Sequence, residues 1–206
     1  MRFLLLLSSC FLFFFGCTTM YRQLAVTNGE VTDIQQFKPV VKVALYAAQV
    51  DVAGNHLSGL LMMKKMPDSS TRLVFSNEMG FTFFDFEFTS EGVFKVHSVI
   101  KKMNKKSVLT TLKKDFELVL MQNLAAENLV VRKSGSLLYY IFPQKKGYYC
   151  YIIDAISNKM VHMERSSERK NVVSAEMKNY YNGMPDTIGI THHNFNFTIG
   201  LKKLEK

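Results

Sequence analysis

The 206-residue sequence lacks the spacing motifs of the common enzyme classes. It has no HExxH or HxxxH pair, no G-x-S-x-G elbow and no glycine-rich phosphate loop. It has no tryptophan either, and after residue 17 no apolar run approaches the roughly 20 residues that a membrane-spanning helix needs. We therefore expect neither a membrane-spanning helix in the rest of the chain nor a catalytic site of these classes.

Individual polar residues do not assemble into a site. The histidines are scattered, at His56, His97, His162, His192 and His193. The adjacent pair makes a poor chelate because neighbouring residues on a strand point to opposite faces. Asp85 and Glu87 share a strand face and could form an acid/base pair, but a solvated outer face is the favoured interpretation. The sequence predicts a protein that is not an enzyme and has no metal or cofactor.

The first residues have the layout of a secretory signal peptide. Arg2 precedes an apolar run that stops at Gly16 and Cys17. The end of this run resembles a bacterial lipobox, whose cysteine thiol receives diacylglycerol and becomes the new amino terminus. We predict a signal peptide over residues 1–16 and lipidation at Cys17. Cys10 matches the motif's letters but leaves too short an apolar core, and an uncleaved anchor or a plain secreted protein remains the alternative.

Acylation at Cys17 predicts a stable membrane attachment, because two or more acyl chains anchor a protein firmly. Thr18 follows the cysteine, which by resemblance to other lipoproteins implies the outer membrane. The phenylalanine-rich signal resembles those of the Bacteroidetes group, and the lack of acidic residues in 18–22 implies a periplasm-facing protein. Cys150 is then left without a disulfide partner, and its apolar surroundings predict a buried, inert thiol.

The charge balance is basic, with a formal net charge of +9. A basic surface favours anionic partners such as lipid headgroups or acidic glycans, although a merely solvated basic surface explains it as well. Nucleic acid is not expected as a partner, because an exported, tethered protein does not meet it and no binding motif is present.

Antiparallel strands dominate the chain after a tether that we assign to residues 17–37. Turn signals recur every 8–12 residues or so, the spacing of a sandwich, barrel or meander. The expected strands cover residues 42–50, 57–65, 71–76, 81–88, 93–99, 129–132, 137–142, 148–156, 159–165, 171–179, 187–191 and 195–201. Ten or more such strands must twist and coil. We assign residues 38–206 to a single domain.

One segment, from Asn104 to about Asn123, has helical periodicity instead. Its apolar stripe comprises Val108, Leu109, Leu112, Phe116, Val119 and Leu120, with lysines on the opposite face. Asn104 is the expected N-cap. The stripe must cover another element, and a curved sheet is the only large partner that this chain offers.

The strand block containing Leu57-Ser58-Gly59-Leu60-Leu61, the central helix, the antiparallel C-terminal block and the lipobox together resemble the LolA/LolB-like superfamily of periplasmic lipoprotein carriers and acceptors. The resemblance covers about residues 38–204. It implies an α+β, mainly antiparallel fold: a curved, unclosed β-barrel with a helix inserted midway that covers the concave face. It also implies that acyl chains of a lipid or lipoprotein cargo enter an apolar cavity between sheet and helix.

The residues that we expect to line this cavity come from the helix and the facing strands. They are Leu109, Leu112, Phe116 and Leu120 on the helix, and Met62, Phe84 and Phe86 on the sheet. The 12 methionines and 17 phenylalanines suit either a cavity for apolar ligands or a filled core. The alternative function is that of a non-enzymatic accessory or structural lipoprotein in an outer-membrane protein assembly.

Overall fold

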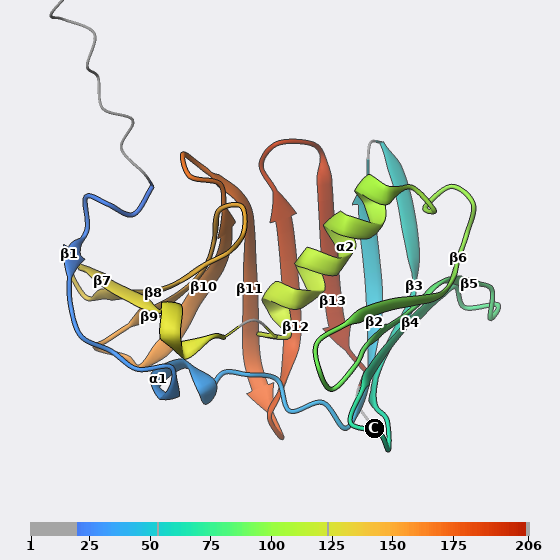
Figure 1. Cartoon of the computed structure of the whole chain (residues 1–206). Helices are drawn as coiled ribbons and strands as arrows, with labels where there is room; N and C mark the ends of the chain where they lie inside the picture. Colours follow the sequence, from blue (N-terminus) through green and yellow to red (C-terminus); the bar gives the residue numbers. More distant parts are fainter. Residues whose placement is uncertain (1–19, 53, 123, 205–206) are drawn as a thin grey trace, which may run out of the picture.

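The computed structural model describes residues 20–52, 54–122 and 124–204. The predicted signal peptide, residues 1–16, and the lipidation site Cys17 lie outside the described residues. The described chain forms one antiparallel sheet that curves around a single main helix (Figure 1). Its strand order is β1-β7-β8-β9-β10-β11-β12-β13-β2-β3-β4-β5-β6, and the end strands β1 and β6 do not pair with each other. This confirms the predicted unclosed β-barrel with an inserted helix.

The elements have the following bounds. The strands are β1 (Ala25–Val26), β2 (Val43–Val52), β3 (Asn55–Lys65), β4 (Thr71–Ser76), β5 (Thr82–Phe88), β6 (Phe94–Val99), β7 (Val130–Ser134), β8 (Leu137–Pro143), β9 (Tyr148–Asp154), β10 (Lys159–Ser166), β11 (Asn171–Tyr181), β12 (Met184–His192) and β13 (Phe197–Lys203). The helices are α1 (Thr32–Gln35), α2 (Lys106–Val119) and a short 3-10 turn, η2 (Ala126–Asn128). Every predicted strand has a counterpart among β2–β13, whereas β1 was not predicted. Among the described residues, no helix is long and apolar enough to cross a bilayer.

The last strand, β13, lies in the middle of the sheet. It pairs with β12 on one side, where Ile199 faces Ile190, and with β2 on the other, where Ile199 faces Val50. Alternate residues of β13, namely Phe197, Ile199 and Leu201, are buried on the concave face, as their spacing predicted. This strand joins the N-terminal half of the sheet to the C-terminal half.

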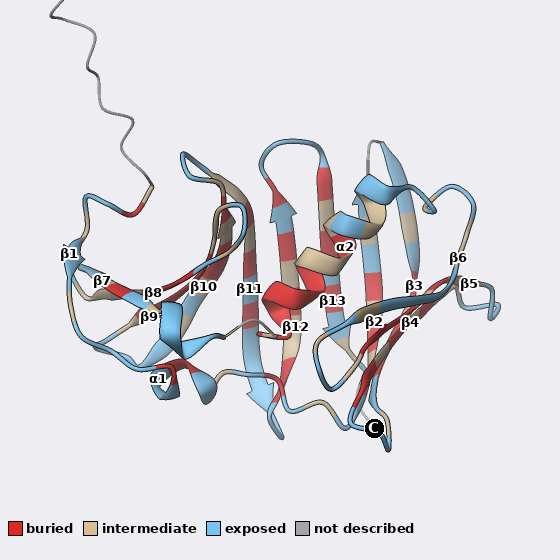
Figure 2. Ribbon diagram, in the orientation of Figure 1, coloured by how far each residue is buried: buried red, intermediate tan, exposed pale blue. Residues whose placement is uncertain are grey.

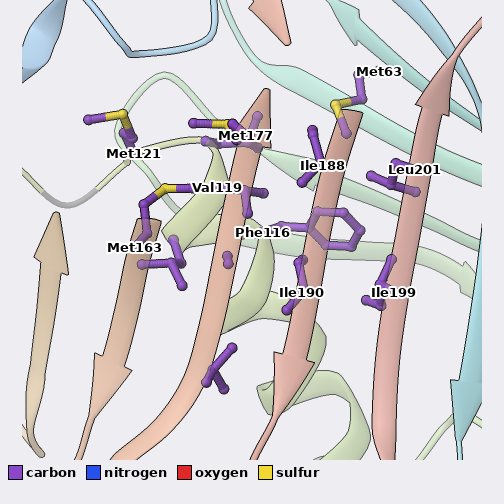
Figure 3. Close-up of a cluster of buried hydrophobic side chains, with 14 of the residues drawn as sticks. Met63, Phe116, Val119, Met121, Met163, Met177, Ile188, Ile190, Ile199 and Leu201 are labelled. Atoms are coloured by element: carbon purple, nitrogen blue, oxygen red, sulfur yellow. The ribbon is translucent and has the colours of Figure 1, made fainter. Parts of the chain in front are cut away.

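The main core lies between the concave face and the C-terminal half of α2 (Figures 2 and 3). Phe116 points from the helix toward Ile188 and Ile190 on β12, and Val119 lies nearer Met163 and Met177. Met163 and Met177 fill the space beside them, as flexible methionines commonly do in irregular gaps.

The helix begins later than its sequence suggested. Asn104 is not the N-cap, because its N–H donates to the carbonyl of Ile100 (3.1 Å) in the turn that follows β6. Lys105 takes the N-cap position in an extended conformation, without a side-chain capping bond. The first turn of α2 therefore presents free N–H groups and the positive end of the helix dipole.

The helix also ends earlier than the predicted Asn123. Met121 adopts a left-handed conformation, with φ of +50°. Its N–H donates to the carbonyl of Leu118 (3.2 Å), and the N–H of Gln122 donates to that of Glu117 (3.1 Å). This pair of bonds is the Schellman arrangement that closes helices, usually with glycine at the left-handed position. Methionine is unusual at this position, and its side chain is buried in the core. The sequence therefore contains no signal for the end of the helix here.

The described part of the predicted tether, residues 20–37, is folded onto the sheet. Tyr21 packs on the convex face against Cys150 in a small second core. β1 then pairs with β7, and Ile34 of α1 is fully buried in the main core on the other face. The segment wraps around one edge of the sheet, because apolar side chains from it reach both faces. Because the segment is short and has mixed polarity, its sequence did not predict that it packs against the sheet.

Cys150 is a free, buried thiol, which confirms the prediction for its burial. Burial raises the pKa of this thiol well above its usual range. The group therefore stays protonated and apolar in the second core.

Tyr21→Phe is expected to lower the free energy of unfolding by about 1.5–3 kcal/mol, as for other hydrogen bonds to charged groups. The Tyr21 hydroxyl donates to Glu164 Oε2 (2.6 Å) and lies 2.7 Å from Ser166 Oγ, all in buried surroundings. Urea denaturation of the chain from Thr18 onward measures the change. Tyr181→Phe is the control, since its ring is 70% exposed. Equal effects of the two substitutions would show that the buried hydroxyl does not hold the segment.

Candidate functional site

A cavity of about 710 Å³ lies between the N-terminal half of α2 and the concave face of the sheet. Its walls come from β2, β3, β4, β5 and β13, from the helix, and from the segment 100–105 that leads into it. Nearly all of the lining is apolar. The volume falls in the range of about 300–1,000 Å³ that is typical of small-molecule sites.

Strand alternation supplies the apolar wall. On β2, Ala48, Val50 and Val52 point inward at every second position, and on β3 Leu57 and Leu61 do the same. These side chains are too short to reach the helix. The outer part of the helix contributes only the small side chains of Ser107, Val108 and Thr111 to the lining, and the space between the layers stays unfilled there.

An aromatic cluster closes the inner end. The rings of Phe84 and Phe86 stack, with centroids 4.2 Å apart, and Phe84 meets Phe116 of the helix edge-on at 6.0 Å. The ring of Phe75 packs against that of Phe84, with centroids 5.6 Å apart. Each of these contacts stabilises the fold by about 0.5–1.5 kcal/mol beyond the contribution of the area that it buries. Together they hold the inner end of the cavity closed.

The opposite end of the cavity opens to solvent. Lys102, Lys105 and Asn55 line it there and are exposed, as is Phe195, whose ring is 45% exposed. The site therefore combines an apolar interior with a positively charged mouth. This arrangement fits an elongated apolar ligand that ends in an anionic or polar group.

Three of the predicted cavity residues come together around this space: Phe84, Leu112 and Phe116 all line it. Phe86 is fully buried behind Phe84 and is not part of the lining. Leu109 is half-buried against the core, also outside the lining.

The other two predicted residues lie elsewhere. Leu120 caps the C-terminal end of α2 and borders a second, more polar hollow near Val40 and Gln122. Met62 is half-buried on the convex face of β3, because the inward positions of that strand are the odd-numbered ones, Leu61 and Met63. A shift of one residue along a strand moves a side chain to the other face.

Sequence reasoning missed the lining residues on β2, β3 and β13. The alternating apolar pattern of these strands was visible, and it could have identified Val50 or Leu57 as inward-facing. Their proximity to α2 was not visible, since it depends on β13 lying beside β2.

Buried charges fix the C-terminal half of α2 to the sheet. Asp115 accepts hydrogen bonds from Arg165 Nη2 of β10 (3.2 Å) and from His192 Nε2 of β12 (2.8 Å). The side chains of Asp115 and His192 are completely buried. The His192 ring lies 4.8 Å and 4.7 Å from the rings of Phe195 and Phe197, measured between centroids. We refer to Asp115, Arg165 and His192 as the Asp115 cluster.

Two tyrosines of β9 strengthen this attachment. Tyr149 donates to Glu117 Oε2 (3.0 Å), and Tyr151 donates to the carbonyl of Leu118 (3.2 Å). Burial raises the pKa of both hydroxyls, so they remain donors at any physiological pH. The helix is thus fixed at its C-terminal end, whereas its N-terminal end borders the open mouth.

The remaining polar candidates have structural partners. Asp85 accepts a two-point bond from Arg72 (2.5 and 2.7 Å), and Glu87 lies 2.7 Å from His97 Nε2, both on the face away from the cavity. Within the described chain, no group of three or more histidine, cysteine, aspartate or glutamate side chains is arranged to hold a metal ion.

No protein-family model matches the sequence, and no curated protein does. Among solved structures, the chain is similar to a candidate outer membrane lipoprotein-sorting protein domain from Vibrio parahaemolyticus, with a TM-score of 0.48, 9% identity and coverage of 85% of this chain and 90% of that one. It is also similar to a DUF1329 family protein from Desulfovibrio piger, with a TM-score of 0.46, 10% identity and coverage of 85% and 88%.

Proposed function

We propose that this protein binds the acyl chains of a lipid or lipoprotein in the cavity under α2, as a carrier or acceptor anchored in the outer membrane through Cys17 and facing the periplasm. The observation that carries the proposal is the cavity itself, which is apolar inside and basic at its mouth. Side chains of the protein do not fill it, which favours a ligand site over a packed core.

The energetics suit an acyl chain. Each methylene group that moves from water into the cavity contributes about 0.8 kcal/mol. The aromatic inner end at Phe84 and Phe116 would receive the tip of the chain, and Lys102 and Lys105 would lie beside a headgroup phosphate or carboxylate. The site offers few hydrogen-bond partners in its interior, so recognition there depends on shape and apolar area.

Uptake does not require the whole helix to leave the sheet. Such a movement would strip Asp115 of both partners, and breaking a buried ion pair costs about 3–5 kcal/mol. The mouth lies at the other end of the helix, where Lys105 and Val108 border the open cavity. A ligand can therefore enter lengthwise while the Asp115 cluster stays intact.

Lipid extraction tests the proposal directly. The chain from Thr18 onward keeps every described residue, so it retains both cores without the acyl group. Mass spectrometry of this protein should detect co-purified lipid or fatty acid in folded samples, and delipidated protein should bind a fluorescent fatty acid with saturation at one site. Protein that is folded, carries no lipid and fails to bind the probe would contradict a carrier function.

The second candidate is a non-enzymatic accessory or structural role in an outer-membrane protein assembly. It is supported by the edge strand β6, which among the described strands pairs only with β5 and so leaves one edge for an added strand. A dry, lipid-free cavity together with co-purification of an outer-membrane protein would favour this role over lipid carriage.

A further inference from the structure

One end of the barrel gathers features that fit a bilayer surface. We use the term mouth end for the hairpins β2–β3, β4–β5, β8–β9, β10–β11 and β12–β13 together with segment 100–105. The antiparallel order of the strands brings these connections to the same end of the sheet. Most of them lie at the upper end in Figure 1, and the β4–β5 hairpin lies at the right. The cavity opens here, between Asn55, Lys102 and Phe195.

The connecting segments at this end are more basic than those at the other end. Its connections carry seven lysines and arginines, which are Lys101, Lys102, Lys105, Lys145, Lys146, Arg169 and Lys170, and two acidic residues, Glu78 and Glu168. The five hairpins at the opposite end contain no lysine or arginine and two acidic residues, Asp68 and Glu91, and the segment that leads into β2 at that end adds Lys38 and Lys42. The positive end of the α2 dipole also points to the mouth end, where no side chain caps it.

The N-terminal segment meets the body at the same end. The N–H of Met20 donates to the carbonyl of Glu168 (2.9 Å) on the β10–β11 hairpin. Cys17 lies three positions before Met20 in the chain, and three residue steps of extended chain span at most about 11 Å. Acylation of Cys17 would therefore hold the mouth end, rather than the opposite end, close to the membrane.

We propose that the mouth end is a docking surface for a bilayer containing anionic phospholipids, with its lysines and arginines on the headgroups and Phe195 at the interface. Anionic headgroups attract such basic clusters by about 1 kcal/mol per lysine or arginine near the surface. An exposed aromatic ring among the lysines suits the interfacial layer, where one side is apolar and the other is wet. The surface is independent of the cargo and would place the cavity mouth at the headgroups.

Vesicle binding tests whether the lysines of the mouth end attract anionic lipid. The chain from Thr18 onward, without acyl groups, should bind phosphatidylglycerol-containing vesicles more tightly than vesicles of phosphatidylcholine alone. The triple variant Lys101→Glu, Lys102→Glu, Lys105→Glu should lower the partition coefficient by about 100-fold. The matched control, Lys64→Glu, Lys65→Glu, Lys159→Glu, makes the same change in net charge near the opposite end, about 30 Å away along the strands. Charges at that distance are screened at physiological ionic strength, so the control should bind like the unmodified chain.

The absence of tryptophan gives a direct measurement of orientation. Phe195→Trp places a single indole at the mouth end, and Tyr181→Trp places one at the opposite end, where the tyrosine is 70% exposed. The emission of the first should shift to the blue on addition of phosphatidylglycerol vesicles, and that of the second should not. The shift should persist when Leu57→Asp is added to block the cavity, which separates docking from lipid uptake.

Three results would overturn the docking surface. One is equal loss of vesicle binding in the two triple variants, the second is a blue shift only for the indole at position 181, and the third is a shift at position 195 that disappears with Leu57→Asp. The last result would still support lipid uptake, whereas docking that persists without fatty-acid binding would contradict only the proposed cavity function.

Discussion

Asp115→Asn is expected to lower the free energy of unfolding by about 3–5 kcal/mol, the cost of breaking a buried ion pair by removing one partner. The substitution keeps the volume of the side chain but removes its charge. Arg165, with its side chain 16% exposed, would then keep its positive charge in the protein interior without a counterion. The fully buried His192 would lose its carboxylate partner as well.

Chemical denaturation of the chain from Thr18 onward measures this loss. Asp186→Asn is the matched control, because Asp186 pairs with Lys202 at the surface and such pairs contribute about 0–1 kcal/mol. The same loss in both variants, or a loss below that of the control, would mean that the Asp115 cluster does not hold α2 against the sheet.

Leu57→Asp is expected to weaken the binding of a fatty acid by at least about 30-fold, since an acyl chain would have to desolvate a carboxylate at a cost of about 2 kcal/mol or more. Leu57 is half-buried and lines the cavity, so in the empty protein water can reach the new carboxylate through the mouth. The fold should therefore tolerate the change better than one at Leu112, which is 3% exposed and packs into the core.

The control for this variant is the next residue of the same strand. Ser58→Asp adds the same charge on the opposite, exposed face of β3 and should leave the affinity for the fatty acid within about twofold, as expected of a surface change outside the site. Fluorescent fatty-acid titration compares the two, with thermal unfolding as the check on folding. Unchanged affinity in Leu57→Asp would exclude the cavity as the binding site.

Much of the fold follows from local patterns in the sequence. Period-two alternation and turn residues predicted β2–β13, and the 3.6-residue period predicted α2. The errors lie at positions where tertiary contacts outweigh local preference. Met121 takes a left-handed conformation that favours glycine because its side chain is buried in the core. Ala25–Val26 is too short to stand out as a strand and is stabilised by pairing with β7.

The site was predicted less well than the fold. Phe84, Leu112 and Phe116 were found because a helical stripe and a phenylalanine-rich strand must face each other across the interior. Met62 was placed on the wrong face of β3, since methionines at both even and odd positions left the register ambiguous. The space itself could not be predicted, because it depends on how far the start of α2 stands from the sheet, which side-chain periodicity does not encode.

The position of β13 has a consequence for synthesis. Until residues 197–203 have been synthesised, β12 and β2 each lack one neighbour, so a chain that stops before β13 exposes two unpaired backbone edges in place of a continuous sheet. Only chains that include β13 can bring the two halves together, and fragments that stop before Phe197 should aggregate or be degraded rather than persist as a smaller functional protein.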